Sequence, residues 1–164
     1  MKKNKISKNW VNKQRRDIYV RQSKVDGYRA RSAYKLIELD EKFKIFKGGI
    51  NVIDIGAAPG SWSQYASKVI KNGKLISIDL KPMDKIEHTI QIKGDFTELS
   101  TQNQIKEILT KKIDVIMSDM AVNTTGIKNI DAIQTGELCI EAVSYTHLRA
   151  HETVLDLVCR LLLE

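Results

Sequence analysis

The sequence predicts an α/β fold in which helices cover both faces of a parallel sheet. Three observations support this prediction: amphipathic segments separate four short apolar runs, a glycine-bearing turn follows the first run, and each run ends near an aspartate. Strands that alternate with helices form βαβ units, and such units build a doubly wound sheet. At 164 residues the chain is expected to form one domain.

The first expected elements are a helix over residues 31–43 and a strand over residues 49–53. The helix carries Leu36, Leu39 and Phe43 at a spacing that places them in one apolar stripe. The strand is a short apolar run that ends at a turn, which is typical of a buried strand in a parallel sheet.

The turn after this strand contains Gly56 and Gly60, and a helix over residues 61–70 is expected to follow it. Glycines let a ligand approach the backbone closely, and the first turn of a helix offers unpaired N–H groups. The spacing differs from the G-x-G-x-x-G fingerprint of dinucleotide-binding proteins, and Pro59 lacks the N–H that a phosphate would use. The turn therefore favours a nucleotide-like cofactor without pyrophosphate over the NAD of an oxidoreductase.

Further strands and helices continue the alternation. Strands are expected over residues 74–79, 89–94 and 113–120, and helices over residues 102–109 and 132–143.

The four expected strands end near Asp54, Asp79, Asp95 and Asp119. Open α/β sheets bind ligands just beyond the carboxyl ends of their strands. Asp79 lies 19 residues after Gly60, at the position that holds ribose hydroxyls in doubly wound sheets, and Asp95 and its aromatic neighbour could flank an adenine. For any one acid, and for Asp54 in particular, the alternative role is that of a helix N-cap or a loop residue.

Several blocks of the sequence together resemble the FtsJ-type (RrmJ-like) ribosomal RNA ribose 2′-O-methyltransferases. The matching blocks are residues 17–20, 27–36, 54–65, 79–84, 94–96 and 118–121. The departures are small: Ile18 and Val122 stand where the family usually has proline, and Ser61 where it often has glycine.

This resemblance implies a Rossmann-like S-adenosylmethionine-dependent methyltransferase fold, of which the chain would hold the N-terminal half of the sheet only. The family's strand order is 3-2-1-4-5-7-6, so strand 4 is expected to be an exposed, aggregation-prone edge. The implied cofactor contacts are Gly60, Trp62, Asp79, Asp95 and Asp119. For Trp62, the alternative role is that of a core aromatic, and both roles are compatible.

The resemblance also implies a catalytic role for two residues. The family uses a Lys-Asp-Lys-Glu tetrad, whose first two members fall on Lys35 and Asp119. The second lysine and the glutamate belong to later strands and have no counterpart here, so this chain is expected to be an inactive fragment. Without its surrounding motif, Lys35 would be interpreted as a phosphate contact or a solvated helix residue.

Positive charge is concentrated near the N-terminus. Residues 1–35 carry 12 basic and two acidic residues, a net charge of +10, whereas the whole chain carries +7. Such a segment, interleaved with Trp and Tyr, favours RNA binding. The expected RNA contacts are Arg15, Arg16, Arg21, Lys24, Arg29 and Arg31. For residues 1–16, a disordered leader is the alternative.

The expected substrate is large-subunit ribosomal RNA, modified at a uridine. Transfer RNA and a purely RNA-binding, non-catalytic role remain open alternatives. The sequence has no signal-peptide pattern and no apolar run long enough to cross a membrane. Cys139 and Cys159 lack metal-binding spacing. A cytoplasmic, metal-free monomer is therefore expected.

Composition changes near Ser144. Residues 1–143 contain 20 Lys and 21 Ile but only 7 Leu, whereas residues 144–164 contain 6 Leu and neither Lys nor Ile. The expected division is a basic leader over residues 1–16, a partial methyltransferase domain over 17–143 and a non-native tail over 144–164. The alternative for the tail is an amphipathic helix carrying Leu148, Leu155, Val158 and Leu162.

Overall fold

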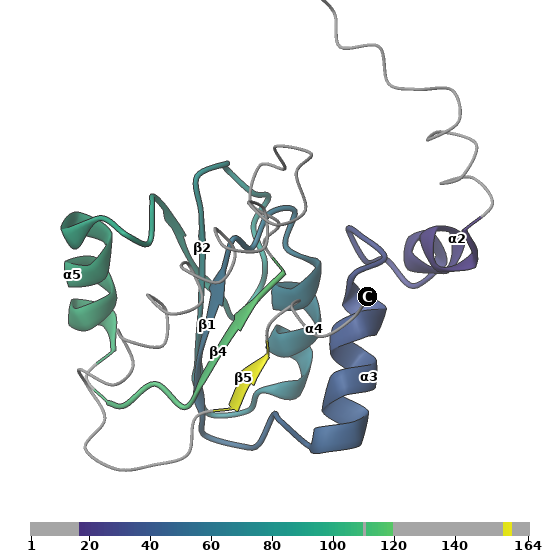
Figure 1. Cartoon of the computed structure of the whole chain (residues 1–164), viewed down its shortest axis with the longest axis horizontal. Coiled ribbons are helices and arrows are strands. Elements are labelled where there is room, and N and C mark those ends of the chain that lie inside the picture. The colour runs from purple at the N-terminus through teal and green to yellow at the C-terminus, as the bar shows by residue number, and fades with distance from the viewer. Residues whose placement is uncertain (1–16, 110, 120–155, 159–164) are drawn as a thin grey trace, which may run out of the picture.

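A parallel sheet forms the centre of the molecule in the computed structural model, which describes residues 17–109, 111–119 and 156–158. The strand order is β3-β2-β1-β4-β5, and each neighbouring pair is parallel (Figure 1). The strands are β1 (Asn51–Ile55), β2 (Lys74–Asp79), β3 (Ile90–Lys93), β4 (Val115–Ser118) and β5 (Asp156–Val158).

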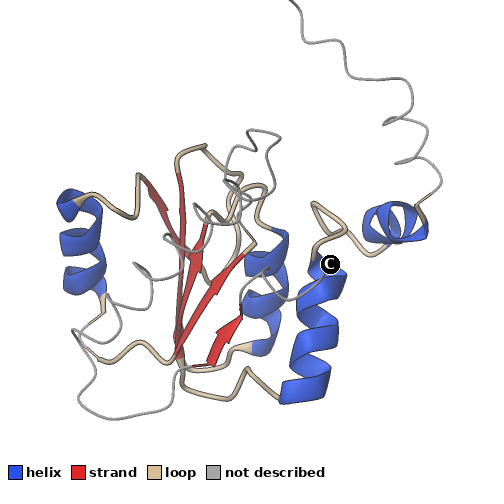
Figure 2. Ribbon diagram, viewed as in Figure 1, coloured by secondary structure: helices blue, strands red, loops and turns tan. Residues whose placement is uncertain are grey.

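Helices lie on both faces of this sheet, as Figure 2 shows. Helix α5 (Leu99–Ile108) covers one face, while α3 (Ala33–Phe43) and α4 (Ser61–Val69) lie side by side on the other. The doubly wound α/β fold and the order of the first four strands are therefore confirmed. The sequence did not predict α2 (Ile18–Val25), which Asp17 caps by accepting a hydrogen bond from the Tyr19 N–H at 2.9 Å.

Alternation along the strands divides the core into two layers. In β1, Ile53 and Ile55 belong to the cluster under α5, whereas Val52 belongs to the cluster under α3 and α4. The same alternation holds in β2 and β4 because successive side chains of a strand point to opposite faces. Both faces are covered, which explains why these strands are apolar almost throughout.

The edge of the sheet differs from the expectation. Residues of β5 pair with β4, with Ile116 opposite Leu157, so the prediction of an exposed fourth strand is wrong. The same three residues are extended, so the alternative of a terminal helix is wrong at 156–158. The helix expected over 132–143 lies outside the described residues.

The apolar stripe of α3 is shorter than predicted. Leu36 is buried and Leu39 packs against the core, but Phe43 is 60% exposed. Phe43 is the last residue of the helix, and the chain turns away through Lys44 in the left-handed conformation. Ile45, just after the helix, is buried in place of Phe43. Among the described residues, no helix is long and apolar enough to cross a membrane.

Candidate functional site

The glycine turn at the carboxyl end of β1 is fastened to the end of β2. The N–H groups of Gly56 and Ala57 donate to the carbonyl of Ile78 at 2.8 and 3.1 Å. The next N–H, that of Ala58, donates to Asp79 Oδ2 at 2.8 Å. The turn is therefore held above the sheet by the strand that supplies one of the predicted ligand-binding acids.

Gly60 occupies a position that only glycine fits. Its φ is +102°, and a Cβ atom would lie 2.7 Å from Ile86 Cδ1 and 2.8 Å from an Arg29 guanidinium nitrogen. Gly60 also precedes the first turn of α4, whose N–H groups face the end of the turn. The side chains of Ile86 and Arg29 pack directly against this glycine and leave no room for a Cβ atom.

Arg29 clamps two loops together. Its guanidinium donates to the carbonyls of Pro59, Asp84 and Lys85 at 3.0 to 3.1 Å, and its backbone N–H donates to Gln64 Oε1 at 2.8 Å. These bonds join the glycine turn to the loop after β2. Arg29 was predicted as an RNA contact, and the sequence contained nothing that indicated this clamping role.

Asp79 and Asp95 lie at the ends of neighbouring strands. Asp79 Oδ1 accepts from the Lys81 N–H at 2.7 Å, and its carbonyl accepts from the Gly94 N–H at 3.0 Å. Asp95 Oδ1 accepts from both the N–H and the hydroxyl of Thr97. Both carboxylates are partly exposed and fixed in orientation, and a carboxylate oxygen can accept more than one hydrogen bond.

Asp54 has neither of the roles that its sequence context suggested. It lies inside β1 at 1% exposure and faces α4, where Ser63 Oγ donates to it at 2.5 Å and is itself 2.5 Å from Ser77 Oγ. Burial raises the pKa of the Asp54 carboxyl to about 7, against a lowering effect of the Ser63 hydroxyl. The charges of Asp119 and Asp79 raise this pKa further, which places those carboxylates within electrostatic reach.

The only polar residues inside the apolar runs of β1 and β2 could have indicated this network. Asp54 and Ser77 each interrupt such a run, and their registered pairing in the sheet brings them together. Ser63 completes the network from the first turn of α4.

Trp62 has a core position. Its ring is 3% exposed, it packs in the cluster under α3 and α4, and its Nε1–H donates to the Ser32 carbonyl at 2.8 Å. A second bond joins the hydroxyls of Ser32 and Ser61 at 2.8 Å. Trp62 thus fixes the start of α3 against the start of α4, and its contact with a cofactor stays a prediction.

Lys35 and Asp119 line one hollow of about 370 Å³. Lys35 comes from the first turn of α3, and Asp119 directly follows β4. The remaining lining residues are Tyr19, Arg31, Ser32, Tyr34 and Glu38. The structure therefore brings together the two residues that the sequence proposed as catalytic, from positions 84 residues apart in the chain.

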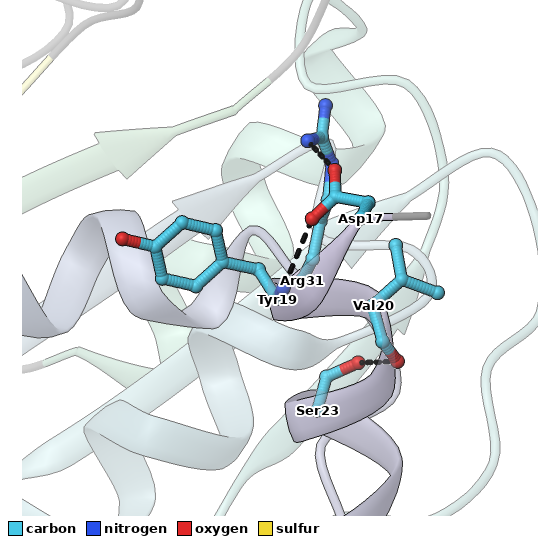
Figure 3. A network of polar contacts seen from close by, with 5 residues as sticks. All are labelled: Asp17, Tyr19, Val20, Ser23 and Arg31. Atoms are coloured by element: carbon cyan, nitrogen blue, oxygen red, sulfur yellow. Dashed lines mark hydrogen bonds and ion pairs between the residues drawn. The ribbon is translucent and has the colours of Figure 1, made fainter. Parts of the chain in front are cut away.

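Two other side chains of this hollow, those of Arg31 and Tyr34, are held by charged partners. Arg31 forms an ion pair with Asp17, whose carboxylate also caps α2, as Figure 3 shows. Burial and a hydrogen bond to Asp26 raise the pKa of the Tyr34 hydroxyl to about 12. Tyr34 therefore stays protonated at neutral pH, and Lys35 and Arg31 are the basic residues that line the hollow with Asp119.

A larger hollow of about 800 Å³ lies between α4 and the loop after β2. Lys68, Lys71 and Lys85 line it, but none of the strand-end acids does. It shares Arg29 with the clamp at the glycine turn, but the strand-end acids do not line it. Within the described residues, no group of three or more His, Cys, Asp or Glu side chains could hold a metal ion.

The sequence of the chain matches a known family. The FtsJ-like methyltransferase profile matches residues 28–161. The chain belongs to this family. Members transfer methyl groups, so the family requires a methyl donor, and the resemblance stated from the sequence blocks is confirmed.

Relatives of this FtsJ-like chain are named as ribosomal RNA methyltransferases. The chain is 72% identical over 146 residues to ribosomal RNA large subunit methyltransferase E of Pelagibacter ubique (strain HTCC1062), covering 89% of the chain and 72% of the relative. It is 46% identical over 145 residues to the protein of the same name from Rickettsia akari (strain Hartford), covering 85% of the chain and 64% of the relative. The chain thus spans about two thirds of the length of these relatives.

A solved structure supports the same fold. A crystal structure from Plasmodium falciparum, described as a ribosomal RNA methyltransferase, superposes with a TM-score of 0.68 at 38% identity. The match covers 76% of this FtsJ-like chain and 73% of the other.

The predicted RNA contacts of this FtsJ-like chain fall into different environments. Arg21 and Lys24 are exposed on α2, Arg31 is paired but lines the hollow, and Arg29 serves as the clamp. Arg15 and Arg16 lie outside the described residues. RNA binding by all six stays a prediction.

Proposed function

We propose that the chain is part of an S-adenosylmethionine-dependent methyltransferase that modifies a ribose 2′-hydroxyl of large-subunit ribosomal RNA. The observation that carries this proposal is the hollow that Lys35 and Asp119 both line, in a fold whose glycine turn is fastened to Asp79. The names of the relatives support the choice of RNA.

The chemistry of the strand ends fits this cofactor better than a dinucleotide. Asp79 and Asp95 offer oriented carboxylate acceptors, which suit ribose hydroxyls and an adenine amino group. A pyrophosphate placed among Asp79, Asp95 and Asp119 would be repelled, whereas a sulfonium and an ammonium would be attracted. Gly60 would lie near the cofactor as part of the turn that Asp79 holds at the ends of the strands.

When bound, S-adenosylmethionine would supply an electrophilic sulfonium methyl group. The ribose 2′-oxygen would bond to that methyl carbon while the C–S electron pair stays with sulfur, and the hydroxyl proton would pass to a base that the missing part of the domain supplies. The role of Lys35 is to hold and polarise that hydroxyl from the wall of the hollow. Asp119 faces the same space and orients the cationic groups near the transferred methyl.

Calorimetry and a chimera test the proposal. The 164-residue chain should bind S-adenosylmethionine and show no measurable affinity for NAD. A fusion of residues 1–143 to the remaining C-terminal part of the Pelagibacter relative should methylate unmodified large ribosomal subunits. In the fusion, Lys35→Ala and Asp119→Asn should each lower kcat by about 10²–10⁴-fold. Lys35→Ala should leave the affinity for the cofactor nearly unchanged.

The substrate comparison belongs to the same experiment. Transfer-RNA transcripts given to the fusion should remain unmethylated. Methylation of transfer RNA but not of large subunits would replace the substrate and keep the chemistry. RNA binding without any transfer would instead favour the non-catalytic role.

A further inference from the structure

The hollow contains one exposed aromatic side chain, Tyr19, to which the proposed reaction assigns no role. Tyr19 is 51% exposed and lines the same hollow as Lys35 and Asp119. Tyrosine combines a large apolar ring with a polar hydroxyl and is enriched at binding interfaces. Helix α2, which carries it, contributes little to the core, with Ser23 as its buried residue.

The ring of Tyr19 is held in place before any ligand arrives. It packs against Tyr34 with ring centroids 5.5 Å apart, and Tyr34 in turn meets Tyr28 at 5.9 Å. The Tyr34 hydroxyl is anchored by Asp26. One side of the Tyr19 ring is therefore supported by other rings, while half of its surface faces solvent.

The backbone beneath Tyr19 is also fixed. Figure 3 shows the Asp17 carboxylate between the Arg31 guanidinium and the Tyr19 N–H, with the Tyr19 ring pointing away from that ion pair. Ser23 Oγ donates to the Val20 carbonyl at 3.0 Å on the next turn. A side chain ordered in this way loses little conformational entropy when it binds a planar ligand.

We propose that Tyr19 is a stacking platform for a base of the RNA strand whose ribose enters the hollow of Lys35 and Asp119. This inference rests on the proposed function. RNA outside double helices is recognised by unstacked bases on aromatic rings, and each such contact is sequence-tolerant because every base has a flat face. Lys35 lines the same hollow as the ring and supplies positive charge for an adjacent phosphate.

Base dependence of binding tests this platform. The probes are a labelled oligouridylate of about twelve nucleotides and an oligomer of the same length whose riboses carry no base. For the 164-residue chain, the ratio of Kd for the abasic oligomer to Kd for the oligouridylate should be well above one. Tyr19→Ala should reduce this ratio by about 5- to 100-fold, the range for one stacked base.

Three further variants separate stacking from folding. Tyr19→Leu keeps an apolar side chain against Tyr34 but removes the ring, so it should lower the ratio as Tyr19→Ala does. Tyr19→Trp should retain the ratio. Phe43→Ala is the matched control, because Phe43 is an exposed aromatic on α3 that does not line the hollow.

Salt dependence gives an independent check. A stacked base releases no counterions, so the slope of log Kd against log salt should be the same for the chain and for Tyr19→Ala. An unchanged base ratio in Tyr19→Ala and Tyr19→Leu would overturn the platform. If the chimera transfers methyl groups while that ratio is unchanged, the platform fails and the proposed function stands. If Tyr19→Ala loses the base-dependent binding while the chimera transfers no methyl group, the platform stands and the proposed function fails.

Discussion

The Asp79 carboxylate accepts a hydrogen bond from the Ala58 N–H at 2.8 Å and so joins the end of β2 to the glycine turn after β1. The sequence suggested a ligand-binding role for Asp79 but not this second role. One carboxylate thus shapes the turn and offers its remaining acceptor positions to a ligand. Substitution of Asp79 should therefore weaken cofactor binding by more than the loss of one hydrogen bond to the cofactor.

Asp79→Ala should weaken binding of S-adenosylmethionine by about 1.5–3 kcal/mol or more, the range for hydrogen bonds to a charged group. The turn loses its anchor at the same time as the cofactor loses an acceptor. Calorimetric titration of S-adenosylmethionine into Asp79→Ala and into a control variant measures this loss of affinity. Asp84→Ala is the control, since Asp84 accepts hydrogen bonds from Arg29 and Gln91 through its backbone carbonyl. Equal affinities for the two variants would remove Asp79 from the site.

Gly60→Ala should destabilise the turn and abolish cofactor binding. The added Cβ meets Ile86 and Arg29 below 3.0 Å in a left-handed conformation, so either the turn or the clamp must shift. Gly48→Ala is the matched control, because its Cβ would lie 3.8 Å from the nearest atom. Urea unfolding and cofactor titration of both variants should show losses for position 60 only. Normal binding by Gly60→Ala would show that the turn adapts.

Asp54 should make stability depend on pH. Because its pKa in the folded protein is about 7, against an ordinary value of 3.8, the folded state holds this proton more tightly than the unfolded state. Its contribution to the free energy of unfolding is therefore fully present below about pH 4 and is lost as the pH rises toward 7, with a total on the order of 4 kcal/mol.

Asp54→Asn should remove that slope, because the amide does not titrate. Urea unfolding at several pH values between these limits measures it. Glu87→Gln changes an exposed acid and should leave the slope intact. A parallel pH profile for the chain and for Asp54→Asn would mean that the buried carboxyl does not titrate in this range.

Arg29→Lys keeps the charge but cannot reach three carbonyls with a rigid fork. The free energy of unfolding should fall by about 1.5–3 kcal/mol, and cofactor affinity should fall with it. The salt slope of RNA binding should not change, because the charge is retained. Lys24→Arg, on the exposed face of α2, is the control. A change confined to RNA affinity would restore Arg29 to its predicted role.

The strands were predictable because both faces of the sheet are covered. An apolar run such as that of β2 must then form a strand wherever it is bounded by turns, and its predicted bounds match the structure. Helix α2 was not predictable by this means, since its residues bury little and it is fixed by the Asp17 cap and the Arg31 ion pair. Such local polar contacts leave no periodicity in the sequence.

The candidate site could be proposed from the sequence where a motif or a strand end marks it. Lys35 and Asp119 followed from the family blocks, and the structure brings them to one hollow. Arg29 shows the limit: one basic residue in a basic segment looks like its neighbours, and only the fold brings the carbonyls of residues 59, 84 and 85 to it. The pairing of β5 with β4 was missed because composition alone indicated a non-native tail.

The 164-residue chain should bind S-adenosylmethionine yet transfer no methyl group at a measurable rate. The turn, Asp79 and Asp119 are present, whereas the second lysine and the glutamate of the family tetrad have no counterpart among the matched blocks. Loss of general acid–base assistance alone typically costs 10²–10⁴-fold. Transfer from labelled cofactor to unmodified large ribosomal subunits, compared between the chain and the chimera, measures this difference. Rapid methylation by the chain itself would show that Lys35 and Asp119 suffice, and that residues 144–164 are part of the native fold.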